Sequence, residues 1–209
     1  MDIPATTALP SQPDAWPDTG PDAIPGAHHP AYPAALRRLH WISALILLGA
    51  AAIVLARALA DDGSTEKLLT ELHRAVGSCI LVLTLLRLGW RLKGALPRHP
   101  ALSPLLRLAA QGAHTGLYLL LFAVPLLGWS LSSAAGKPVR LAGLIPLPAL
   151  LGRDRDLADD LAHWHTLAGY LLLGLVALHV AAALWHFAVR KDNVLYSMLP
   201  LGPLRRPHP

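Results

Sequence analysis

The chain has a single cysteine, Cys79, and this scarcity excludes several kinds of site. One cysteine allows no disulfide within the chain and no CxxCH motif for covalent haem attachment. It also cannot hold an iron–sulfur cluster, which needs several ligands. Charge is scarce too: Asp, Glu, Lys and Arg make up 15% of the residues, against about 25% in soluble domains. Because 54% of the 209 residues are hydrophobic, a compact soluble protein could not cover its apolar surface. The composition predicts an integral membrane protein.

The two ends of the chain lack hydrophobic runs. Residues 1–34 contain no Lys or Arg and no apolar core, so both parts of a signal peptide are missing. They are rich in Pro, Ala and Asp, and we expect a disordered tail there. Residues 201–209 are a second expected tail, and the folded domain is expected at 35–200. The net charge of +5 is spread along the flanks of hydrophobic segments, which argues against nucleic acid as a partner.

Four hydrophobic segments are each long enough to cross a hydrocarbon core of ~30 Å as a helix. They lie at about 39–60, 72–92, 108–131 and 161–189, with linkers expected at 61–71, 93–107 and 132–160. The predicted fold is an all-α, integral membrane four-helix bundle. With the N-terminus inside, the inner flanks hold 11 of the 18 basic residues and five of the 13 acidic ones. Since basic residues favour the cytoplasmic side, both termini are expected in the cytoplasm.

The last hydrophobic segment contains four histidines and no charged residue. Polar side chains are costly inside a membrane, so their spacing invites a functional interpretation. His165 and His179 are 14 residues apart, which places them within ~40° on one helical face and ~21 Å apart along the axis. His163 is rotated by ~160° from His179. One imidazole near each membrane surface suits two stacked haems, each iron needing a second histidine from another helix.

The remaining segments supply partners at matching depths. His40 begins the first segment at the inner surface, level with His179, and His73 begins the second segment at the outer surface, level with His165. The spacing therefore predicts two non-covalent haems, ligated by His40 and His179 inside and by His73 and His165 outside. Arg87 falls at the inner level, where it could bind a haem propionate. The alternatives are hydrogen-bonded bundle histidines or another metal. Structural zinc is disfavoured, because it needs four ligands around one ion.

Two further histidines lie on the inner side. His114 begins the third segment, and it could replace an inner ligand, line a quinone pocket or bond across helices. His186 lies ~10 Å beyond His179, too far to ligate the same iron. A protonatable group there suits quinone chemistry, because a quinone takes up protons as it is reduced. An idle interfacial histidine is the alternative.

Several stretches resemble the bacterial cytochrome b561 family, which is related to the cytochrome b subunits of nickel–iron hydrogenases. They are LHW at 39–41, LHRAVGSCILVLTLLRLGWRL at 72–92, HTGLYLLLFAVPLLG at 114–128, WHTLAGY at 164–170 and LHVAAALWHFAVRKDN at 178–193. The resemblance covers about 36–200. It implies a four-helix di-haem b cytochrome with His40, His73, His165 and His179 as ligands. The HWH doublet departs from the family pattern, because His163 offers a competing ligand.

The resemblance implies a bacterial inner-membrane protein that transfers electrons between the quinone pool, ubiquinone included, and an extracytoplasmic redox partner. Superoxide oxidation coupled to ubiquinone reduction is known in the family and is one alternative. It would need a positive outer surface, for which Lys137, Arg140, Arg153 and Arg155 are candidates. A second alternative is a cytochrome b anchor subunit of a hydrogenase or dehydrogenase, and a third is a bundle without redox function. Membrane lipid is an expected partner, and the sequence leaves a homodimer open.

Overall fold

The computed structural model describes residues 33–93, 104–191 and 194–199. Nearly all of the expected N-terminal tail, and the whole of the expected C-terminal tail, lie outside these residues. The described part contains four helices that are long and apolar enough to cross a membrane. They are α1 (Ala34–Ala58), α2 (Gly63–Lys93), α3 (Pro104–Ala134) and α4 (Arg155–Trp185). This confirms the predicted multi-pass helical membrane protein.

The helices begin before the apolar runs do, so the expected linkers at 61–71, 93–107 and 132–160 are too long. Polar caps explain the difference for two helices. The Asp62 carboxylate accepts hydrogen bonds from the Ser64 hydroxyl and from the Thr65 N–H, the latter at 2.8 Å. These bonds stabilise the charged form and lower the pKa of the Asp62 carboxyl. The Asp154 carboxylate accepts from the Leu157 N–H at 3.1 Å, so α4 begins at Arg155.

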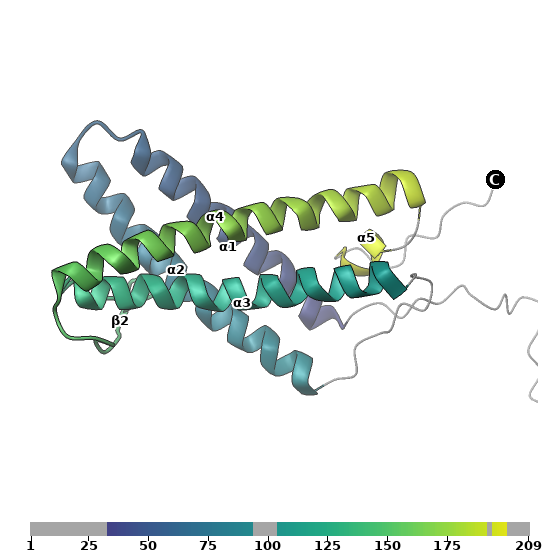
Figure 1. Ribbon diagram of the computed structural model, residues 1–209, viewed down its shortest axis with the longest axis horizontal. Coiled ribbons are helices and arrows are strands. Elements are labelled where there is room, and N and C mark those ends of the chain that lie inside the picture. The colour runs from purple at the N-terminus through teal and green to yellow at the C-terminus, as the bar shows by residue number, and fades with distance from the viewer. Residues whose placement is uncertain (1–32, 94–103, 192–193, 200–209) are drawn as a thin grey trace, which may run out of the picture.

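The helices form two antiparallel pairs that cross (Figure 1). α1 packs along α2, α3 packs along α4, and α2 contacts α3. Among the long helices, α4 packs along α3 only, as far as the described residues go. The core lies midway along the bundle, where each helix contributes one buried apolar residue. These are Ala50, Ile80, Leu121 and Leu172.

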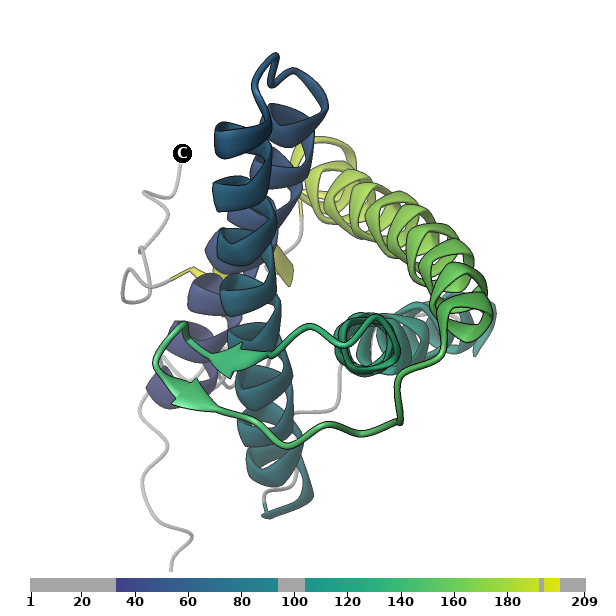
Figure 2. The same cartoon turned by 90° about the vertical axis from the view of Figure 1, so that its left-hand side faces the viewer.

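A short hairpin packs on the side of α2, near the middle of the helix. It consists of β1 (Arg140–Leu141) and β2 (Ile145–Pro146), paired antiparallel, and Figure 2 shows it in front of α2. Its turn passes through Ala142 and Gly143, both at positive φ. Ser78 of α2 anchors the turn, because its hydroxyl oxygen accepts a hydrogen bond from the Ala142 N–H at 3.0 Å. Part of the long α3–α4 connection is thus fixed on the bundle.

One end of the bundle is closed by the last described residues. A π-helical turn, η1 (His186–Arg190), continues α4, and it ends at Lys191 in the left-handed conformation. The short helix α5 (Val194–Met198) follows. Two side chains of α1 hold it: the Arg37 guanidinium donates to the Leu199 carbonyl at 2.9 Å, and the Trp41 indole donates to the Met198 carbonyl at 2.7 Å.

Candidate functional site

One face of α4 carries a histidine, a core leucine and a second histidine, each seven residues after the last. His165, Leu172 and His179 lie on one face, and the Leu172 side chain in the middle is only 3% exposed. Seven residues of helix span ~10.5 Å, so the two imidazoles flank the apolar core from either end. On α2, His73 lies at one end of the same core and Arg87 lies at the other. The bundle therefore has two polar levels separated by apolar side chains.

The level nearer the hairpin, called the outer level after the predicted orientation, brings together His73 and His165; the other is called the inner level. Their ring centroids are 6.1 Å apart, and the ring planes are inclined at 83°. The Nδ1 atom of His73 is buried and makes no hydrogen bond of ordinary geometry with the described residues. The Nδ1 atom of His165 lies 3.0 Å from the carbonyl oxygen of Val124 on α3. Neither ring is fully exposed.

The inner level contains three imidazoles. The ring centroids of His40 and His179 are 6.4 Å apart, and those of His114 and His179 are 5.6 Å apart. An Arg87 guanidinium nitrogen lies 3.3 Å from Nδ1 of His40 and can only donate to it. His114 is exposed, whereas His40 and His179 are half-buried. The structure thus places the ambiguous His114 close to the inner pair.

The geometry of both pairs can be tested against a haem iron. A nitrogen–metal bond is ~2.0 Å, and the ring centroid lies ~1.1 Å behind the nitrogen, so a bridged pair has centroids about 6 Å apart. The spacings of 6.1 and 6.4 Å agree with this value. One turn after His73, a Cβ added at Gly77 would meet no atom within 4 Å, apart from neighbouring backbone. The donor atoms and the spacing therefore fit a non-covalent, bis-histidine haem.

Two arginine side chains lie over one tyrosine ring beside the inner level. The guanidinium carbons of Arg87 and Arg91 each lie 5.4 Å from the ring centroid of Tyr118 on α3. Each cation–π contact is worth about 0.5–2 kcal/mol. Neither arginine forms an ion pair within the described part of the chain. Such a cluster in a membrane protein favours an anionic group nearby. Arg87 was predicted from its depth along the second hydrophobic segment, whereas Arg91 and Tyr118 were not predicted.

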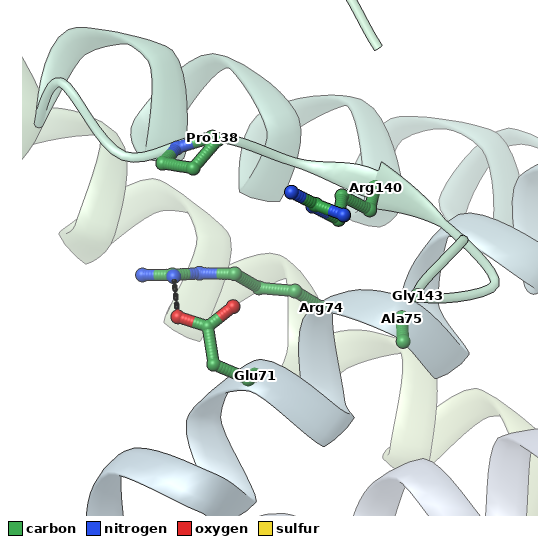
Figure 3. A pocket seen from close by; sticks show the side chains of 6 residues that line it. All are labelled: Glu71, Arg74, Ala75, Pro138, Arg140 and Gly143. Atoms are coloured by element: carbon green, nitrogen blue, oxygen red, sulfur yellow. Dashed lines mark hydrogen bonds and ion pairs between the residues drawn. The ribbon is translucent and has the colours of Figure 1, made fainter. Parts of the chain in front are cut away.

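A cavity of about 330 Å³ lies at the outer end, between α2 and the hairpin. It is lined by Glu71, Arg74, Ala75, Pro138, Arg140 and Gly143 (Figure 3). The carboxylate of Glu71 pairs with Arg74 at 2.5 Å, and the Arg140 side chain points into the same space. Arg140 was predicted as part of an outer basic patch, whereas Arg74 was not predicted, although it directly follows His73. Lys137, Arg153 and Arg155 do not line this cavity.

The remaining candidate residues lie further from the paired rings. His163 is exposed, and its ring packs against that of the neighbouring Trp164, with centroids 5.6 Å apart. His186 is half-buried at the start of the π-helical turn. Of the two histidines in the HWH doublet, His165 therefore faces the bundle, because its ring is the one beside His73.

Comparison with known proteins agrees with the resemblance seen in the sequence. The model of a family described as prokaryotic cytochrome b561 matches residues 31–201. Cytochrome b561 homolog 2 of Escherichia coli is 36% identical over 166 residues, or 77% of this chain and 86% of that protein. The probable superoxide oxidase CybB of Yersinia pestis is 32% identical over 163 residues, or 78% of this chain and 92% of that protein. The chain therefore belongs to the prokaryotic cytochrome b561 family of membrane electron-transfer proteins, which bind b-type haem.

Proposed function

We propose that the chain binds two b-type haems, one near each membrane surface, and transfers electrons between the quinone pool and an extracytoplasmic redox partner. The proposal rests on one observation: two imidazole pairs lie at opposite ends of a single apolar core. α4 supplies one histidine to each pair, and α1 and α2 supply the others. Each bound haem would provide one-electron redox chemistry.

In this proposal the four paired histidines are axial ligands. His40 and His179 hold the inner haem, and His73 and His165 hold the outer haem. With both axial positions occupied by imidazole, binding of oxygen at the iron is disfavoured. Arg87, which has no ion-pair partner among the described residues, would bind an inner haem propionate through a charge-assisted hydrogen bond.

The proposed orientation places both chain ends in the cytoplasm and the protein in the bacterial inner membrane. It rests on the basic residues, 11 of 18 of which flank the inner ends of the four helices. The cavity at Arg74 and Arg140 then faces outwards, and His114 and His186 lie on the cytoplasmic side. An inner quinone site is consistent with this arrangement, because His114 lies close to His179 and a histidine that holds no iron can take up and release protons near neutral pH.

Haem quantitation tests the proposal. The purified protein should contain two haems per chain, and acid–acetone should extract both, because no cysteine is available for a covalent CxxCH linkage. A ratio of one haem per chain, or a colourless folded protein, would refute the di-haem arrangement.

Superoxide oxidation coupled to ubiquinone reduction is a second candidate function. The cavity favours it, because two guanidinium groups and one carboxylate leave a net positive charge beside His73. Clefts of one charge sign raise the local concentration of an oppositely charged substrate. The relative from Yersinia pestis is named a probable superoxide oxidase. In this reaction two superoxide anions would each give up one electron and leave as oxygen, while one quinone takes up two electrons and two protons.

A further inference from the structure

We propose that α3, which supplies none of the four proposed ligands, sets the outer haem site by holding His165 in its ligating form. Two features of α3 do this: the carbonyl group of Val124 and the absence of a side chain at Gly128. The inference rests on the proposed function for the identity of the ligand, but the contacts themselves do not depend on haem. α3 and α4 pack against each other and lie closest toward the connection that joins them (Figure 1).

The first feature fixes the tautomer of His165. Its Nδ1 atom lies 3.0 Å from the Val124 carbonyl oxygen. A carbonyl oxygen only accepts hydrogen bonds, so Nδ1 must carry the proton. A neutral imidazole has one proton on its nitrogens, and Nε2 therefore presents a lone pair. The nitrogen that would bind the iron is thus ready before haem arrives.

The second feature fixes the position of the ring. Gly128 lies one helical turn after Val124, and a Cβ added there would lie 3.0 Å from Cε1 and 3.3 Å from Nδ1 of His165. Real Cβ atoms rarely approach other atoms so closely. Cε1 is bonded to both ring nitrogens, so a methyl group at residue 128 would move the hydrogen-bonding and the ligating nitrogen together. Glycine is disfavoured within helices relative to alanine, so its presence here is explained by space for the ring.

Among the proposed ligands, the carbonyl partner of His165 has ordinary hydrogen-bond geometry in the described residues. Nδ1 of His73 is buried and makes no hydrogen bond of ordinary geometry with the described residues, although the Ala50 carbonyl lies beside that ring. Nδ1 of His40 faces the Arg87 guanidinium, which donates. A carbonyl partner at Nδ1 increases the basicity of a ligating imidazole. The Val124 carbonyl would therefore make His165 a stronger electron donor to an iron held there. Val124 and Gly128 are positioning residues.

The test compares Gly128→Ala with a matched control, Gly116→Ala, on the same helix. A Cβ at Gly116 would lie 3.0 Å from Leu175 Cδ2 on α4. Both substitutions therefore add one methyl group between α3 and α4. There the contact atom is the end of a flexible side chain. We expect Gly128→Ala to weaken haem retention in the outer site by roughly 10–100-fold and to raise the outer midpoint potential. Gly116→Ala should leave both unchanged.

The measurements are haem transfer to apomyoglobin and a spectroscopic redox titration of each purified variant. Equal effects of the two substitutions, or a Gly128→Ala protein with the parent's potential and retention, would overturn the inference. A separate measurement on haem-free protein covers the case in which the proposed function is wrong. In spectra of ¹⁵N-histidine-labelled protein, His165 should carry its proton on Nδ1 in the parent and in Gly116→Ala, but not fully in Gly128→Ala. A proton on Nε2 in the parent would refute the role of Val124 whatever the haem content.

Discussion

The rings of His73 and His165 lie 6.1 Å apart, although the helices that carry them, α2 and α4, do not pack along one another in the described part of the chain. The two helices approach through their imidazoles instead. Direct helix packing would leave no room for a flat group between the rings. The arrangement therefore leaves space for the haem proposed between the two rings, and it gives the following predictions.

The HWH doublet gives the first prediction. His163 is exposed beside Trp164, and His165 faces the bundle. We expect His165→Ala to lose the outer haem and His163→Ala to keep two haems per chain. Haem content and the optical spectrum of the two purified variants measure this. Loss of haem in His163→Ala alone would show that the other histidine of the doublet is the ligand.

The inner side gives the second prediction. His186 lies at the start of the π-helical turn, at the end of the bundle that is proposed to face the cytoplasm. A positioned histidine that transfers protons contributes about 10²–10⁴-fold to a rate. We expect His186→Ala to keep both haems but to slow haem reduction by a soluble quinol by roughly 10²-fold. Stopped-flow absorbance measures the rate.

His114→Ala is the comparison variant for the quinol experiment, because His114 is the other proton-transfer candidate. Its ring centroid lies 5.6 Å from that of His179. Both variants are assayed with their haem content confirmed. An unchanged rate in His186→Ala together with a slow His114→Ala would move the quinone site to α3.

The outer cavity gives the third prediction. The Arg140 side chain lines it and is exposed, whereas Arg74 forms an ion pair with Glu71. If superoxide enters here, Arg140→Gln should slow superoxide-driven haem reduction roughly two- to tenfold and reduce its dependence on salt. Lys137→Gln is the matched control, since Lys137 is an exposed outer cation that does not line the cavity. Equal rates in Arg140→Gln and the parent would exclude the cavity as the entry site.

Helical periodicity was enough to predict the large features of the protein. Hydrophobic runs gave the four membrane helices, and the 14-residue spacing placed His165 and His179 on one face. The two rings lie at opposite ends of the core, beside His73 and His40 respectively. That these four residues bind haem stays a prediction.

Contacts between helices could not be predicted in the same way. Val124 and Gly128 reach His165 only because of the register between α3 and α4, and spacing within one segment carries no information about that register. Arg74 and Arg140 line the same cavity because Ser78 anchors the hairpin on α2. The polar starts of α2 and α4 were placed in linkers because their first turns are charged, whereas capping by Asp62 and Asp154 makes these turns helical.

The most direct test of the central claim is a spectroscopic redox titration of the parent, His40→Ala and His73→Ala, with helix content checked by circular dichroism. The parent should show two haem components. Because each pair lies at its own level of the bundle, His73→Ala should lack one component and His40→Ala should lack the other. Loss of the same component in both variants, in protein that keeps its helices, would contradict the assignment of one haem to each pair.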